Sequence, residues 1–232
     1  MAELILALDA ATLEEARQVL DRVGPEPDLV KIGPRLFALG GAEFLAEVRG
    51  MGKRVFLDLK LHDIPNTVAL AVDVLARMDL WALTLHTAGG AEMLTAAVQA
   101  RDKASSALML LGVTVLTSVD DKSWQEVVPA GGKVFEAVLS RAGLVARVGL
   151  DGLVCSPLEV GSIREKVGRG IKTVVPGIRL GDGSDDQRRV ASPGAAVAAG
   201  ADYLVVGRPI LAAPDPAEAT KMILKDMEGA GE

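Results

Sequence analysis

The segment "DLKLHDIPNT", residues 58–67, brings three charged side chains close together at the end of an apolar run. Because side chains alternate along a strand, Asp58 and Lys60 are expected to share one face, with Asp63 just beyond in a loop. Neighbouring carboxylates keep a lysine charged, which makes Lys60 a poor former of Schiff bases and a suitable proton donor. A fixed carboxylate beside it would also repel a substrate carboxylate. The cluster therefore favours decarboxylation, in which an anionic group leaves and a proton replaces it.

The same charged residues also have purely structural interpretations. Asp58 and Lys60 could form an ion pair that only closes the end of a strand. Asp63 could cap the helix that is predicted to begin near Pro65. The chemical interpretation gains weight if other strands of the fold carry polar groups to the same place.

Short apolar runs rich in β-branched residues recur along the whole chain. They cover residues 3–9, 28–33, 54–60, 80–87, 108–117, 152–156, 172–178 and 203–208. The segments between them show helical spacing of apolar residues, as in 91–104 and 134–149. Another such segment opens with Thr12 and Glu15, which have the spacing of a capping box.

Near-continuous apolar strands that alternate with helices predict a parallel sheet covered by helices. Eight such units in 232 residues predict a single (β/α)₈ TIM barrel, one domain over residues 1–232. The alternative is an open, doubly wound sheet. Against it, the first strand runs into "ALDAAT", without the Gly-x-Gly-x-x-Gly turn of a dinucleotide site.

In such a barrel, the active site lies at the carboxyl ends of the strands. The residues at or just beyond these ends are Asp9, Lys31, Asp58, Lys60, His86, Thr117, Ser156, Pro176, Arg179, Gly207 and Arg208. The loops after strands 7 and 8 of these barrels often bind phosphate. Gly207 would let backbone N–H groups approach an anion, and Arg179 and Arg208 are suited to phosphate. The hydrophilic loop 180–189 is predicted to act as a lid, although it could be a simple solvent-exposed loop.

Composition argues against several other classes of protein. The net charge of −6 and the pI near 5.1 are typical of a cytoplasmic protein and unlike a nucleic-acid-binding one. No apolar run reaches the roughly 18 to 20 residues of a membrane span, and the N-terminus lacks the basic start of a signal peptide. Two histidines and a single cysteine, Cys155, offer no clear metal site.

The segment "DLKLHDIPNT" resembles the signature of the orotidine 5′-phosphate decarboxylase family. Six further segments match that family in order: "ALD" at 7–9, "VKIG" at 30–33, "VTVLTS" at 113–118, "VVPGIR" at 174–179, "DDQRR" at 185–189 and "VVGRPI" at 205–210. The resemblance covers essentially the whole chain. It implies a cytoplasmic, homodimeric enzyme that makes UMP from orotidine 5′-phosphate in pyrimidine biosynthesis, with no metal and no cofactor.

The resemblance also implies roles for individual residues. Lys60 would protonate C6 of the pyrimidine, Asp58 would lie against the departing carboxylate, and Lys31 would join their charge network and contact the ribose. The catalytic Asp63, with Ile64 and Thr67, would reach into the site of a second subunit. The remaining implied substrate-binding residues are Asp9, Thr117, Ser118, Pro176, Arg179, Gln187, Gly207 and Arg208.

Three rival interpretations stay open at the level of sequence. A decarboxylase of 3-keto-L-gulonate 6-phosphate shares Asp-x-Lys-x-x-Asp, but it uses Mg²⁺ and has an acidic residue where Lys31 stands. Ribulose-phosphate epimerase needs more histidines for its metal. A barrel that only binds UMP, as a sensor, would have little use for so many buried charges.

Overall fold

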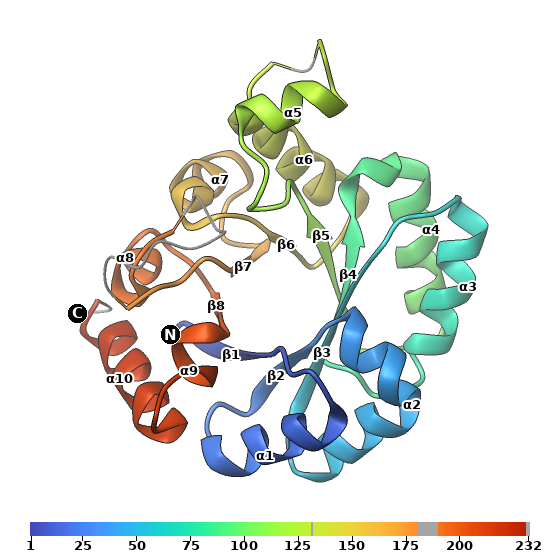
Figure 1. The fold of residues 1–232 in the computed structure, drawn as a ribbon. Helices are drawn as coiled ribbons and strands as arrows, with labels where there is room; N and C mark the ends of the chain where they lie inside the picture. Colours follow the sequence, from blue (N-terminus) through green and yellow to red (C-terminus); the bar gives the residue numbers. More distant parts are fainter. Residues whose placement is uncertain (131, 181–189, 231–232) are drawn as a thin grey trace.

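Eight parallel strands form one closed barrel in the computed structural model, which describes residues 1–130, 132–180 and 190–230. The strands are β1 (Glu3–Leu8), β2 (Leu29–Ile32), β3 (Arg54–Leu61), β4 (Ala82–His86), β5 (Met109–Val113), β6 (Gly152–Val154), β7 (Lys172–Val175) and β8 (Tyr203–Val206). Each pairs with its neighbours in sequence, and β8 pairs with β1 to close the ring (Figure 1). The predicted (β/α)₈ barrel is confirmed, and the doubly wound alternative is wrong.

Helices surround the barrel on its outside (Figure 1). In the described residues they are α1 (Leu13–Val23), α2 (Pro34–Gly50), α3 (Pro65–Leu75), α4 (Gly90–Lys103), α5 (Asp121–Val127), α6 (Val134–Val148), α7 (Val160–Val167), α8 (Pro193–Ala198), α9 (Arg208–Leu211) and α10 (Pro216–Gly229), with 3-10 turns at Thr87–Gly89 and Pro157–Glu159. The predicted cap of α1 is present, because Thr12 Oγ1 accepts the N–H of Glu15 at 3.1 Å. The Glu15 carboxylate accepts the N–H of Ala11, one residue before the cap.

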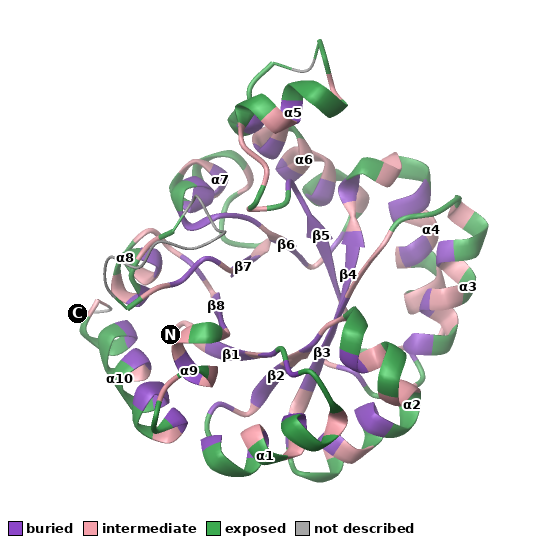
Figure 2. Ribbon diagram, in the orientation of Figure 1, coloured by how far each residue is buried: buried purple, intermediate pink, exposed green. Residues whose placement is uncertain are grey.

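The strands are buried on both faces, which explains their near-continuous apolar sequence (Figure 2). One apolar cluster fills the inside of the barrel, and a larger one lies between the strands and the helices. The buried members of the inner cluster are Ile5, Leu29, Phe56, Ala82, Leu111, Val174, Tyr203 and Val205. Continuing the same alternation along β2 and β3 brings Lys31 and Asp58 to the inside as well, directly above this apolar floor.

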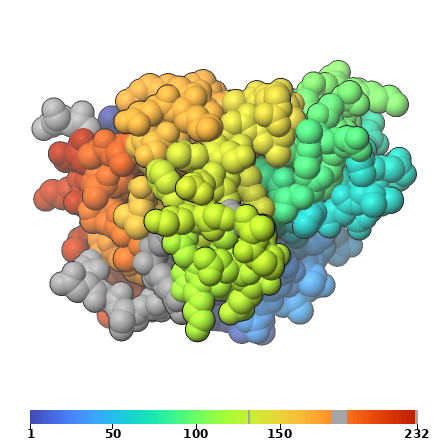
Figure 3. All heavy atoms as spheres, turned by 90° about the horizontal axis from the view of Figure 1, so that it is seen from above, coloured from blue at the N-terminus to red at the C-terminus, as the bar shows by residue number. Residues whose placement is uncertain are grey.

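The connection after β5 carries α5, which lies outside the ring of the barrel (Figure 1) and forms part of the near face when the molecule is seen from above (Figure 3). Trp124 anchors this helix, because its ring is buried and the Arg141 guanidinium lies 5.1 Å from its centre. The barrel therefore carries a packed extension beside its β5 and β6 strands.

Among the described residues, no helix combines the length and the apolar character needed to cross a membrane.

Candidate active site

The charged segment of β3 contains a bulge of two extra residues. Leu57 pairs with Leu83 and Leu61 pairs with Leu85, so residues 58–60 together lie opposite Thr84 alone. Lys60 adopts a left-handed backbone conformation, with φ of 50°, which is uncommon for a residue with a side chain. Simple alternation predicted that Asp58 and Lys60 share a face. They do meet, but through this bulge and turn rather than through a regular strand.

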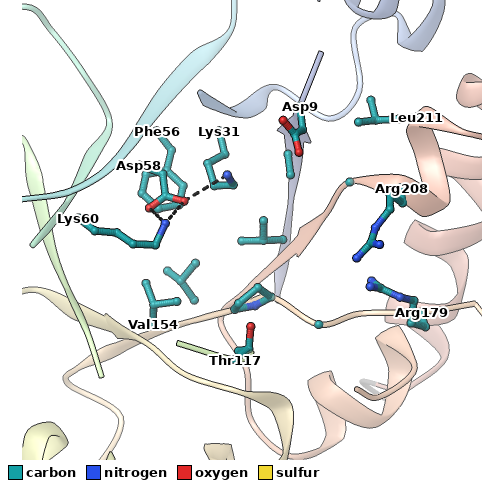
Figure 4. A pocket seen from close by; sticks show the side chains of 16 residues that line it. Asp9, Lys31, Phe56, Asp58, Lys60, Thr117, Val154, Arg179, Arg208 and Leu211 are labelled. Carbon is teal, nitrogen blue, oxygen red and sulfur yellow. Dashed lines mark hydrogen bonds and ion pairs between the residues drawn. The ribbon is translucent and has the colours of Figure 1, made fainter. Parts of the chain in front are cut away.

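Asp58 is the centre of a charge cluster at the mouth of the barrel (Figure 4). Lys60 Nζ lies 2.9 Å from both carboxylate oxygens, and Lys31 Nζ lies 3.2 Å from Oδ2. The Thr84 hydroxyl donates a hydrogen bond of 2.9 Å to Oδ1. Three strands, β2, β3 and β4, therefore converge on a single buried carboxylate.

The two ammonium groups keep this carboxylate ionised. Burial by itself would raise the pKa of Asp58, but the charges of Lys31 and then Lys60, together with hydrogen bonds from Lys60 and Thr84, hold the pKa below its usual value. A pair of unit charges 4 Å apart interacts by about 4 kcal/mol at an effective dielectric near 20. Asp58 is thus a fixed negative charge that faces two fixed positive ones.

A cavity of about 450 Å³ extends from this cluster across the barrel mouth. Its lining residues are Ala7, Asp9, Lys31, Phe56, Asp58, Lys60, Thr117, Val154, Val174, Pro176, Gly177, Arg179, Val205, Gly207, Arg208 and Leu211. Arg179 and Arg208 point toward each other at the far end of the cavity from Lys60 (Figure 4). The cavity therefore has a cationic group at each end, with an apolar floor below.

Most of the residues predicted for the site line this cavity, but some lie elsewhere. Asp63, Ile64, Thr67 and Ser118 are exposed and do not line it. Within the described chain no ion pair links Asp63 to the cluster; its carboxylate accepts the N–H of Ile64 at 2.6 Å. The capping alternative for Asp63 is not supported either, since α3 begins at Pro65 without a side-chain cap. Gln187 and all of the predicted lid 180–189 beyond Leu180 lie outside the described residues.

Sequence reasoning missed Thr84, which touches both Asp58 and Lys60. Its hydroxyl accepts the backbone N–H of Lys60 at 2.8 Å and donates to Asp58. The available signal was weak: one threonine in the middle of the apolar run 80–87, at a position where the fold expects only packing residues. Ser156, at the end of β6, caps the turn Pro157–Glu159 and is fully buried.

His86, at the end of β4, lies beside the cluster in a neutral state. The N–H of Ala88 donates to His86 Nδ1 at 3.2 Å, and the His62 ring stacks on the His86 ring with centroids 5.4 Å apart. Burial, followed by the charges of Arg141, His62 and Lys60, lowers the pKa of His86 to about 4. An imidazolium here would lose the hydrogen bond from Ala88 and face the positive charges of Arg141 and Lys60.

We expect His86 to make folding stability depend on pH. The ordinary pKa of histidine is about 6.5, so between that value and about 4 the unfolded chain binds a proton that the folded chain does not. The free energy of unfolding should therefore fall as pH decreases through this window. In His86→Asn, whose amide oxygen can replace Nδ1 as acceptor, the fall should be shallower. Urea denaturation at several pH values measures this, and an unchanged slope would contradict it.

The described residues contain no group of three His, Cys, Asp or Glu side chains placed to hold a metal ion. Asp58, the most buried carboxylate of the cavity, already has two ammonium groups as partners. The absence of a metal and of a cofactor stays a prediction.

Comparison with known proteins relates this site to one family. The model of the family described as orotidine 5′-phosphate decarboxylase / HUMPS family matches residues 2–223 of this chain. Orotidine 5′-phosphate decarboxylase of Halorhodospira halophila is 44% identical over 229 residues, which cover 98% of this chain and 97% of the relative. The enzyme of Opitutus terrae is 45% identical over 229 residues, with 97% and 98% covered.

A solved structure agrees with these relatives. The crystal structure of orotidine 5′-phosphate decarboxylase from Lactobacillus acidophilus superposes with a TM-score of 0.88 and 35% sequence identity, covering 98% of this chain and 99% of that one. The family model, the close relatives and the shared barrel lead to one conclusion: the chain belongs to the orotidine 5′-phosphate decarboxylase / HUMPS family.

Proposed function

We propose that this protein is a carboxy-lyase that decarboxylates orotidine 5′-phosphate to UMP, the activity named for its relatives. The observation that carries the proposal is the distribution of charge in the cavity. Lys31 and Lys60 flank a buried carboxylate at one end, and Arg179 and Arg208 lie at the other. A substrate with a phosphate at one end and a carboxylate at the other matches this arrangement, in a chain whose overall charge is −6.

The proposed reaction uses the charge cluster directly. The C–C bond to the substrate carboxylate breaks, CO₂ leaves, and the electron pair stays on C6 of the pyrimidine. Lys60, ion-paired with Asp58, donates its proton to C6, while the fixed charge of Asp58 disfavours the bound carboxylate. Arg179 and Arg208 hold the phosphate, and this remote binding energy offsets the cost of placing the carboxylate near Asp58.

The remaining predicted residues are proposed to act on the same substrate. Asp9 and Lys31 would bind the ribose, and Thr117 and Pro176 would contact the pyrimidine from the cavity wall. Gly207 would let backbone N–H groups approach the phosphate, and it also packs closely on β1, where a Cβ would lie 3.3 Å from Ala7 Cβ. The enzyme would work in pyrimidine biosynthesis in the cytoplasm.

We also propose a homodimer in which Asp63, Ile64 and Thr67 complete the site of the partner subunit. All three are exposed beside the mouth of the barrel rather than inside it. Helix α3 continues this surface with apolar side chains that are more than half exposed, at Leu70 and Val74. Covering such a face with a second copy would remove apolar surface from water.

A direct assay tests the activity. Purified protein mixed with orotidine 5′-phosphate should produce UMP and lower the absorbance of the orotate ring, equally with and without EDTA. The same protein given 3-keto-L-gulonate 6-phosphate with Mg²⁺ should show no decarboxylation. No turnover of orotidine 5′-phosphate, with UMP still bound, would instead support the sensor alternative.

Lys60→Ala should remove the proton donor but leave the phosphate and ribose contacts in place. We expect kcat to fall by at least about a hundredfold, the lower range for loss of a general acid, while UMP binds with similar affinity. Lys103→Ala, at the far end of α4, serves as the control and should retain full activity. A Lys60→Ala enzyme with near-normal kcat would show that another group supplies the proton.

The proposed dimer predicts complementation between two inactive variants. A hybrid of Lys60→Ala and Asp63→Ala subunits has one site with both changes and one site with neither. If subunits mix at random, half of the dimers are hybrids, so about a quarter of wild-type activity should return. Each variant alone should stay inactive. No recovery, in mixtures that mass spectrometry shows to have exchanged subunits, would contradict a shared site.

A further inference from the structure

The bulge in β3 leaves one backbone N–H, that of Lys60, outside the regular pattern of hydrogen bonds between β3 and β4. Because residues 58–60 lie opposite Thr84 alone, the N–H of Lys60 does not meet a β4 carbonyl in the regular pattern. It donates instead to the Thr84 hydroxyl, at 2.8 Å. A side chain therefore replaces the missing backbone acceptor at this point, where an unpaired N–H would be costly.

The direction of the hydrogen bonds through Thr84 is fixed by its two partners. The Lys60 N–H can only donate, and an ionised carboxylate can only accept. Thr84 Oγ1 must therefore accept from Lys60 and donate its own proton to Asp58 Oδ1, at 2.9 Å. Thr84 is fully buried, so water has no access from its side to replace either bond.

We propose that Thr84 is a positioning residue for decarboxylation, whose hydroxyl couples the strained backbone of Lys60 to the carboxylate of Asp58. This inference rests on the roles proposed above for Asp58 and Lys60. The hydroxyl holds Lys60 in its left-handed conformation, with φ of 50°, from which its ammonium reaches both oxygens of Asp58. The same hydroxyl fixes the orientation of the carboxylate and helps to keep it ionised.

Thr173 provides a matched control at the opposite end of the barrel. Its hydroxyl accepts the N–H of Asp202 at 3.1 Å and lies 3.2 Å from the Asp202 carboxylate, to which it donates. Thr173 is also fully buried on a strand, β7, but it does not line the cavity. Replacing either threonine by valine removes the same chemical group from a similar environment, and only one of the two lies at the charge cluster.

The test compares Thr84→Val, Thr84→Ser and Thr173→Val with wild type. Loss of hydrogen bonds to a charged group should lower kcat of Thr84→Val by about ten- to a hundredfold, with the Kd for UMP nearly unchanged. The acid limb of its kcat–pH profile should move to higher pH, since Asp58 loses a donor. Thr84→Ser, which keeps the hydroxyl, should recover both properties. Thr173→Val should lose stability but keep its kcat and its pH profile.

Several results would overturn the inference. A folded Thr84→Val with wild-type kcat and pH profile would do so, as would a Thr84→Ser as impaired as Thr84→Val, because packing alone would then explain the loss. If Thr84→Val does not fold, Thr84→Cys keeps the shape with a weak donor and should give an intermediate kcat; wild-type kcat there would also contradict the role. Failure of the proposed function looks different, because the wild-type protein itself would then not turn over orotidine 5′-phosphate.

Discussion

A carboxylate buried as deeply as that of Asp58 stays charged only where cations and hydrogen-bond donors replace the water it has lost. Lys31 from β2, Lys60 from β3 and Thr84 from β4 supply these groups. Three neighbouring strands are thereby joined through one side chain at the carboxyl end of the barrel. The removal of either cation would leave the buried carboxylate with a single ammonium partner, so these residues form one interdependent unit. The rest of the cavity is arranged around this unit.

The cluster lies where the backbone departs from ideal geometry. Residues two apart on a regular strand are separated by about 6.6 Å along its length. The bulge and the left-handed turn at Lys60 bring its ammonium to 2.9 Å from both oxygens of Asp58. Such a strained residue persists because its surroundings hold it from several sides. Here the packing of the surrounding residues holds the strained backbone and thereby fixes the positions of the charged groups.

The sequence predicted the barrel and most of the cavity lining because both depend on repeated, local patterns. Apolar runs identify strands, and the polar residues after them, such as Asp9, Lys31 and Arg208, must gather wherever parallel strands end together. The bulge has no such pattern, since "LDLKL" reads as an ordinary strand. Thr84 was invisible for the same reason: its importance depends on a pairing register between two strands, which no single stretch of sequence encodes. The roles of exposed residues such as Asp63 depend on a second chain, which a single sequence does not describe.

The bulge holds two extra residues, an even number, and this has a consequence for how such chains vary in length. Leu57 and Leu61 both pack in the outer apolar layer, on either side of the bulge. A one-residue insertion or deletion that left the rest of the bulge unchanged would turn Leu61, the last residue of β3, to the opposite face and out of that layer. Two residues, added or removed together, keep inside and outside unchanged. Related chains are therefore expected to differ between Leu57 and Leu61 by an even number of residues. Insertions and deletions of an odd number of residues are expected in the loop beyond this segment.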